Sequence, residues 1–150
     1  MRNIILIYLI ILIAIVAPVC IVVYQMYPSG SYAYEIDIDL SVTNESGIYV
    51  VTVEKAKEGR GRDVWDFGAF SGTIWTVFPS TSSEDMLLRR SLGFLLNNET
   101  SNLTFYDVDG NGKLSVGDTF VIKGSFAEGG KYFVLRSELG GGDFPIKLGA

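Results

Sequence analysis

The chain of 150 residues carries 12 basic and 17 acidic side chains and no histidine, so its formal net charge at pH 7 is −5. The absence of histidine excludes triads and metal sites that use imidazole, and the negative charge disfavours nucleic acid as a partner. The single cysteine, Cys20, excludes an intrachain disulfide, so the folded part must depend on an apolar core.

The N-terminal region is dominated by an apolar run, residues 4–24, that contains no charged side chain. As a helix it would be roughly 31 Å long, which matches the hydrocarbon core of a membrane. Arg2 precedes the run and no basic residue follows it until Lys55, so the positive-inside rule places the N-terminus in the cytoplasm. We therefore expect a cytoplasmic tail (1–3), a transmembrane helix (4–26), a linker (27–33) and an extracellular domain (34–150).

Two other interpretations of this run stay open. It is longer than the apolar part of most secretory signals, but Ser31-Tyr32-Ala33 is an acceptable cleavage site, after which the mature protein would be secreted. In apolar length it also resembles the N-terminal helix of a type IV pilin, although the basic-Gly processing site and the Glu that follows it are missing.

The remaining chain is rich in strand patterns. Residues 34–42 alternate strictly, with Tyr34, Ile36 and Ile38 on one face and acidic residues on the other, and 48–53 would be the returning strand of a hairpin. Further strands are expected at 72–78, 102–106, 119–126, 131–137 and 144–148, with a charged exposed loop at 54–66 and a helical turn leading into a strand at 86–96. About seven short strands predict a mainly β domain, an antiparallel β-sandwich of the immunoglobulin-like kind, with a barrel as the alternative.

One stretch specifies chemistry by both residue type and spacing: the twelve residues 107–118. Oxygen-bearing side chains stand at positions 1, 3, 5, 9 and 12, and a glycine that permits a sharp turn stands at position 6. This is the pattern of an EF-hand calcium loop. The predicted Ca²⁺ ligands are Asp107, Asp109, Asn111, Lys113 (through its carbonyl oxygen), Ser115 (directly or through water) and Asp118. A hairpin turn that binds nothing is the alternative.

The loop resembles the dockerin-type variant of the EF-hand, which also carries Ser or Thr at position 9 and Asp at position 12. Asp118 is one methylene shorter than the usual Glu, so its bidentate reach requires a closer approach of the backbone. The flanking residues are β-branched and aromatic, so the loop is expected to join two strands and to act as a structural staple. The run Gly112–Phe120 also resembles loops in archaeal surface and pilin-like β-proteins.

Three Asn-x-Ser/Thr sequons, at Asn44, Asn98 and Asn102, fall in predicted turns or at a strand start. They are candidate glycosylation sites and agree with an extracellular domain. The sequence contains no recognisable catalytic pair, since Asp63 and Asp66 lie in a charged loop, and we expect no enzymatic activity.

These features together predict a membrane-anchored extracellular β-domain that Ca²⁺ stabilises. Its expected role is structural or adhesive, as a cell-surface or filament subunit that associates with itself or with other surface proteins, with glycans as further candidate partners. A carbohydrate-binding module is the main alternative, and it would require exposed aromatic rings such as Trp65 and Trp75.

Overall fold

A computed structural model describes residues 36–58, 62–63, 66–78, 82–138 and 142–149. The expected tail, transmembrane helix and linker, together with Tyr34 and Trp65, lie outside these residues. Within them, none of the helices has the length and apolar character needed to cross a bilayer.

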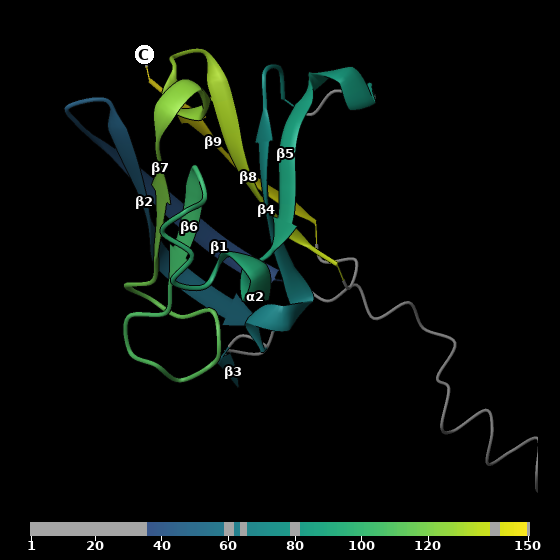
Figure 1. The fold of residues 1–150 in the computed structure, drawn as a ribbon. Helices are drawn as coiled ribbons and strands as arrows, with labels where there is room; N and C mark the ends of the chain where they lie inside the picture. The colour runs from purple at the N-terminus through teal and green to yellow at the C-terminus, as the bar shows by residue number, and fades with distance from the viewer. Residues whose placement is uncertain (1–35, 59–61, 64–65, 79–81, 139–141, 150) are drawn as a thin grey trace, which may run out of the picture. The chain divides into compact units, whose positions relative to one another are not determined.

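The described chain is mainly β and forms two antiparallel sheets (Figure 1). The first has the order β1-β2-β7-β6, and a short strand, β3, also pairs with β2. The second has the order β5-β4-β8-β9. The strands are β1 (Ile36–Glu45), β2 (Ile48–Glu58), β3 (Arg62–Asp63), β4 (Phe70–Trp75), β5 (Met86–Ser91), β6 (Leu103–Tyr106), β7 (Thr119–Ile122), β8 (Lys131–Ser137) and β9 (Asp143–Leu148).

In the described ranges, four short helical segments connect the strands. They are η1 (Phe67–Ala69), η2 (Ser83–Asp85), α2 (Leu92–Leu95) and η3 (Gly124–Ala127). Side chains that precede a segment cap three of them: Asp66 caps η1, Ser82 caps η2 and Ser91 caps α2. Such caps satisfy backbone amides that have no partner inside the segment.

Buried side chains from both sheets form one apolar core. Three aromatic rings in contact, tilted relative to one another, run through it. Phe105 on β6 lies 4.9 Å, centroid to centroid, from Phe120 on β7, and Phe120 lies 4.7 Å from Phe133 on β8 in the second sheet. All three rings are fully buried, so Phe120 is the link between the two sheets at this point.

The first hairpin confirms the predicted alternation. Ile36 and Ile38 are buried whereas Asp37 and Asp39 are exposed, as a half-buried strand requires. The exposed loop predicted from Glu54 onward was wrong at its start, because β2 continues to Glu58 along the whole of β1. The pattern misled because the charged side chains find partners across the strands, as Lys55 does with Asp37 at 2.5 Å.

Two other boundaries differ from the sequence prediction. Residues 86–96 form a strand followed by a helix, the reverse of the expected order, because Leu92 and Leu95 are buried on one side of α2 and the hydroxyl of Ser91 caps its start. The strand expected at 119–126 ends at Ile122, and Gly124, with a positive φ of 66°, begins η3.

Candidate metal centre

The loop 107–118 connects β6 to β7, so the prediction that it joins two strands is confirmed. Two backbone hydrogen bonds, one near the middle of the loop and one near its end, attach it to the rest of the domain. The amide of Phe67 donates to the carbonyl oxygen of Gly112 at 3.3 Å, and the amide of Gly117 donates to that of Val53 at 2.9 Å. Between these two ties Leu114, at position 8 of the loop, enters the apolar core and is 1% exposed. The loop is therefore an integral part of the folded domain.

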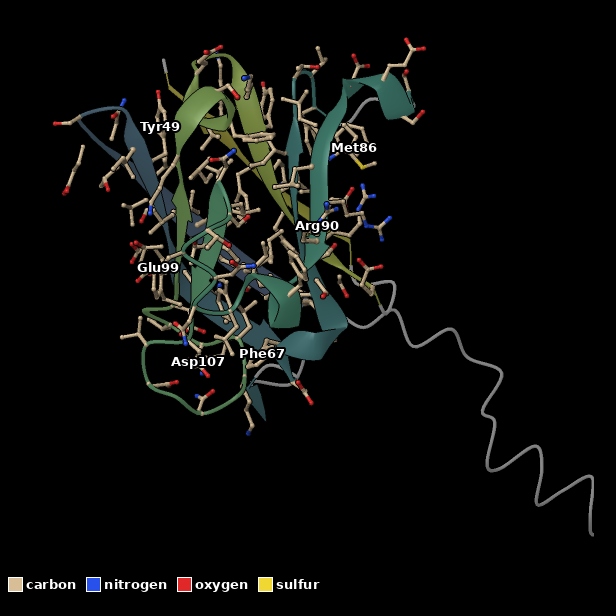
Figure 2. The ribbon with its side chains drawn as sticks, in the orientation of Figure 1. Tyr49, Phe67, Met86, Arg90, Glu99 and Asp107 are labelled. Carbon is tan, nitrogen blue, oxygen red and sulfur yellow. The ribbon has the colours of Figure 1, made fainter. Side chains whose placement is uncertain are left out.

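The three loop carboxylates converge. One oxygen from each of Asp107, Asp109 and Asp118 lies within 4.8 Å of the others. Figure 2 places Asp107 at the same end of the domain as Phe67, where the loop and the connection between β2 and β4 meet. Three like charges this close repel one another in the absence of a cation.

Asp118 is the deepest of the three and is completely buried. Its Oδ1 accepts a hydrogen bond from the amide of Val108 at 3.0 Å, and its Oδ2 accepts one from the amide of Ser115 at 2.8 Å. Burial raises the pKa of Asp118 above its usual value, and the neighbouring charges of Asp107 and Asp109 raise it further, although the two backbone bonds oppose the shift. The protein thus holds a carboxylate where its charge is costly without a cation.

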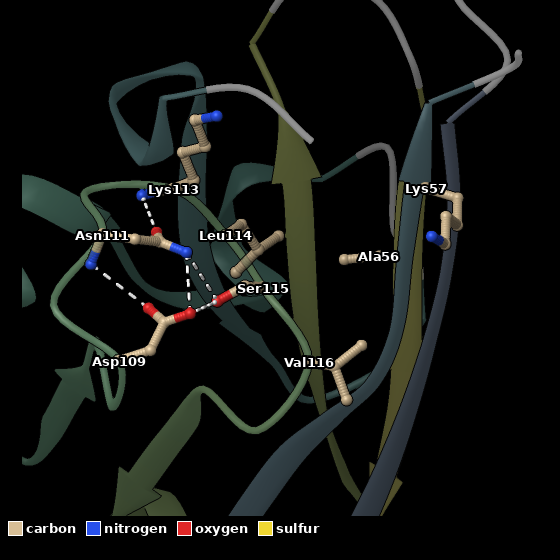
Figure 3. Close-up of a pocket in the computed structure, with 8 residues that line it drawn as sticks. All are labelled: Ala56, Lys57, Asp109, Asn111, Lys113, Leu114, Ser115 and Val116. Atoms are coloured by element: carbon tan, nitrogen blue, oxygen red, sulfur yellow. Dashed lines mark hydrogen bonds between the residues drawn. The ribbon is translucent and has the colours of Figure 1, made fainter. Parts of the chain in front are cut away.

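Asp109, Asn111 and Ser115 form the outer part of the loop (Figure 3). The amide nitrogen Nδ2 of Asn111 donates to Asp109 Oδ2 at 2.7 Å, and the hydroxyl of Ser115 donates to the same oxygen at 3.0 Å. Burial acts to raise the pKa of Asp109, but hydrogen bonds, first from the backbone amide of Asn111 at 3.2 Å and then from the hydroxyl of Ser115, outweigh it and lower the pKa below its usual value. Asp109 is therefore held in the charged form that a metal ligand requires.

Asp107 and Asn111 shape the turn at the centre of the loop. Asp107 Oδ2 accepts a hydrogen bond from the amide of Gly112 at 2.9 Å, and Asn111 Oδ1 accepts one from the amide of Lys113 at 2.6 Å. Gly112 has a positive φ of 72°, a conformation that glycine adopts without strain. The glycine expected at position 6 thus occupies the conformation for which the loop pattern selects it.

The remaining oxygen of Asp107 tests whether the residues fit a cation. Asp107 Oδ1 is buried and accepts no hydrogen bond from any residue that the structure describes. Buried acceptors without a partner are rare in folded proteins. This oxygen and the buried carboxylate of Asp118 are groups that a bound cation would stabilise. Because all the donor atoms are oxygens, the set suits a hard ion such as Ca²⁺.

The predicted ligands are thus placed as follows. The carboxylates of Asp107, Asp109 and Asp118 come together, Asn111 and Ser115 bond to Asp109, and Lys113 contributes a backbone position next to the turn. Its side chain is exposed, as a carbonyl ligand allows.

The other candidate residues lie elsewhere. Asn44 and Asn102 are exposed and Asn98 is half-buried. Trp75 is 5% exposed, so its ring is unavailable for stacking on a sugar. Asp66 Oδ1 accepts a hydrogen bond from the amide of Gly68 at 3.0 Å, which gives it a capping role, and the side chain of Asp63 lies outside the described part.

Sequence reasoning missed the residues that fix the loop to the domain. Asp66 pairs with Lys113 through an isolated β-bridge, and Val53 contacts Asp118 through the backbone. The side-chain types of these residues do not predict the contacts, because backbone groups make them. Leu114 did carry a signal, as an apolar residue at position 8 of an otherwise polar stretch, two residues after the glycine turn.

Comparison with known proteins adds no relative. No family model matches the chain, and neither the curated proteins nor the solved structures contain a significant match.

Proposed function

We propose that residues 107–118 bind Ca²⁺ and that the ion stabilises the β-domain that carries them. The observation that carries this proposal is the convergence of Asp107, Asp109 and Asp118, with the buried Oδ1 of Asp107 left without a hydrogen bond among the described residues. A divalent cation at this point would remove the repulsion between the carboxylates and give that oxygen a partner. The six positions of the loop pattern, which resembles the dockerin-type EF-hand, would supply the coordination.

The ion would stabilise the domain by fixing the conformation of the loop. The loop is bonded to β2 at Val53 and to the start of η1 at Phe67, so fixing the loop fixes segments that are far apart in sequence. Extracellular calcium modules have dissociation constants of about 10⁻⁴–10⁻³ M. At about 100 times that constant, bound ligand adds roughly 2.7 kcal/mol to the free energy of unfolding.

We also propose that the two sheets form an immunoglobulin-like sandwich. In that fold strands A, B, E and D make one sheet, and C, F and G make the other, with the order of neighbours A-B-E-D and C-F-G. Setting aside the two-residue β3, the observed orders β1-β2-β7-β6 and β5-β4-β8-β9 match A-B-E-D and C-F-G with one added edge strand, β5. The calcium loop would then be the D–E connection.

The cellular role that we propose is that of a membrane-anchored surface or filament subunit with a structural or adhesive function. The support is the uncharged run 4–24, the basic residue before it, the three sequons, of which Asn44 and Asn102 are exposed, and the lack of a catalytic pair in the sequence. The domain would be displayed outside the cell, where calcium is plentiful.

The decisive experiment compares thermal unfolding of the full chain in calcium and in chelator. Calcium should raise the melting temperature by several degrees, since about 1 kcal/mol corresponds to about 4 °C for a domain of this size. Asp107→Asn should abolish the difference, whereas Asp39→Asn, which alters an exposed carboxylate on β1, should preserve it. Identical unfolding curves for the unmodified chain under both conditions would rule out the calcium site.

A further inference from the structure

The three sequons match one motif but lie in different surroundings. N-glycosylation links a glycan to the side-chain nitrogen of asparagine, and the motif also requires a hydroxyl group two residues later. A transferring enzyme that acts on the folded domain must therefore reach both groups, the asparagine Nδ2 and the hydroxyl of the serine or threonine. The contacts of these two groups decide which sequon can accept a glycan after folding.

The sequon at Asn44 leaves both groups free. It covers the turn between β1 and β2, and residues 43–48 are all exposed. The backbone amide of Gly47 donates a hydrogen bond to Asn44 Oδ1 at 3.1 Å. Because a backbone N–H must face the oxygen, this bond fixes the orientation of the side-chain amide and directs Nδ2 away from Gly47. Within the described part of the chain, neither Asn44 Nδ2 nor the hydroxyl of Ser46 has a hydrogen-bond partner.

Space for a bulky group is present beside Asn44. This residue borders a hollow at the surface of about 400 Å³, and the other residues that line the hollow are Val42, Thr43, Tyr49, Lys147 and Gly149. Asn44 is exposed and does not belong to the apolar core. A glycan on its side chain would therefore extend into solvent without displacing a core residue.

The sequon at Asn98 has both groups engaged. Its Nδ2 donates to the carbonyl oxygen of Phe94 at 3.3 Å, and its Oδ1 accepts a hydrogen bond from the hydroxyl of Thr100 at 2.7 Å. The backbone carbonyl oxygen of Asn98 accepts two more, from the amide of Ser101 and from the hydroxyl of Thr104, both at 3.0 Å. The asparagine is also half-buried. Transfer to this nitrogen would first require the turn to open.

At Asn102 the asparagine is exposed, but the hydroxyl of its sequon is not. That hydroxyl belongs to Thr104, which lies in β6 and is completely buried. The residue between them, Leu103, is also completely buried and pairs with Ile122 of β7. An enzyme could reach Thr104 only if β6 left the sheet, so this sequon is closed in the folded domain.

We propose that Asn44 carries an N-linked glycan in the folded protein and that Asn98 and Asn102 do not, an inference that rests on the proposed extracellular location. The reaction joins Asn44 Nδ2 to the anomeric carbon of an oligosaccharide carried on a lipid phosphate. The carbon–nitrogen bond forms as the bond between that carbon and the phosphate oxygen breaks. The lipid phosphate leaves with the electron pair of the broken bond, and one proton of Nδ2 passes to a base of the transferring enzyme.

The glycan would lie far from the candidate metal centre. Tyr49, which pairs with Asn44 across the hairpin, and Asp107 of the loop lie at opposite ends of the domain in Figure 2. Loss of the glycan should therefore leave the calcium-induced rise in melting temperature unchanged, so the glycan and the calcium site can fail separately.

The test is peptide mapping by mass spectrometry of the full-length protein, purified from the cells that produce it. Cleavage after Glu99 places Asn98 and Asn102 on separate peptides. The peptide that contains Asn44 should carry a glycan, and the other two asparagines should be unmodified. An unmodified Asn44, or a glycan on either of the other two, would overturn the proposal.

Digestion of intact cells with an external protease separates this inference from the proposed location. If the domain is cut on intact cells but Asn44 is unmodified, the glycan alone is refuted. If the domain is cut only after the cells are lysed, the extracellular location is refuted as well.

Two substitutions in the same turn provide a matched pair. Ser46→Ala removes the acceptor hydroxyl and should abolish the modification of Asn44, whereas Glu45→Gln keeps the motif and should preserve it. Both positions are exposed, and cooperative thermal unfolding of each variant shows that its domain is folded. A glycan on Asn44 in the Ser46→Ala variant at the level of the unmodified chain would contradict recognition of this sequon.

Discussion

The backbone amide of Val53 donates a hydrogen bond to the carbonyl oxygen of Asp118 at 2.9 Å, and the carbonyl oxygen of Val53 accepts one from Gly117 at the same distance. The most buried carboxylate of the candidate calcium centre is thus part of a residue whose main chain is paired with β2. An ion held by the side chain of Asp118 would therefore act directly on a residue whose backbone is bonded to the first sheet.

Calcium affinity should fall as the pH is lowered, beginning at a higher pH than for an ordinary aspartate. The pKa of Asp118 is raised by burial and by its acidic neighbours, and a proton on this carboxylate competes with the ion. In chelator, by contrast, lowering the pH should increase the contribution of Asp118 to the stability of the folded chain. A raised pKa in the folded state means that the folded chain holds this proton more tightly, so the contribution of Asp118 to stability declines as pH rises through that pKa.

The measurement is the calcium-induced shift in melting temperature as a function of pH, with ionic strength held constant. Because the pKa of Asp109 is lowered, its protonation does not contribute to the change in calcium response at the higher pH where Asp118 titrates. A calcium response that stayed constant from neutral pH down to the usual aspartate pKa of about 3.9 would contradict the assignment of Asp118 as a ligand.

Gly112→Ala should weaken calcium binding and reduce the free energy of unfolding by about 1–2 kcal/mol, the cost of a left-handed conformation for a residue with a β-carbon. The added methyl group would meet no atom within 4 Å, so the effect would be conformational and not steric. Gly93→Ala is the control, because it also faces open space but has no positive φ. Chemical denaturation in calcium and in chelator gives both quantities, and equal stabilities for the two variants would argue against a requirement for glycine at this turn.

Phe120→Ala should destabilise the domain by about 3–5 kcal/mol, since it removes the ring that links Phe105 to Phe133 across the two sheets. Phe94→Ala should cost far less, because that ring is 56% exposed. Urea unfolding followed by circular dichroism distinguishes them. Similar midpoints for both variants would mean that the two sheets do not depend on this contact.

Asp143→Asn should cost about 1–2 kcal/mol, between the values for exposed and buried ion pairs. Arg136 donates two hydrogen bonds to Asp143, both of 2.6 Å, and both side chains are about three-quarters buried. Lys55→Gln breaks the more exposed pair with Asp37 and should cost less than Asp143→Asn, because solvent screens that pair. The comparison uses thermal unfolding at low and high salt. The Arg136 pair should be the less sensitive to salt, and the reverse order would contradict this ranking.

The sequence predicted strands with a clear local pattern, both the half-buried β1 and the strands β6 and β8, whose central residues are buried on both faces. The alternation around Ile36 and Ile38 identified β1, and aromatic and β-branched runs identified β6 and β8. It failed where charges are compensated by neighbours, as in the second half of β2, where Lys55 pairs with Asp37. It also failed at residues 86–96, where burial of Leu92 and Leu95 decides the helix.

For the candidate metal centre, local spacing was enough to find every proposed ligand, because all six lie within one loop. It could not reveal the attachment of that loop to Val53 and Phe67, since backbone hydrogen bonds between distant segments leave no trace in side-chain type.

The position of the loop has a consequence for the order of folding. β6 and β7 are separated only by residues 107–118, so their hairpin closes through local contacts, whereas β7 also pairs with β2, far earlier in the chain. Local contacts form before distant ones because less chain entropy is lost in closing them. An ion that orders this loop would thus act before β2 docks, and calcium should speed refolding more than it slows unfolding.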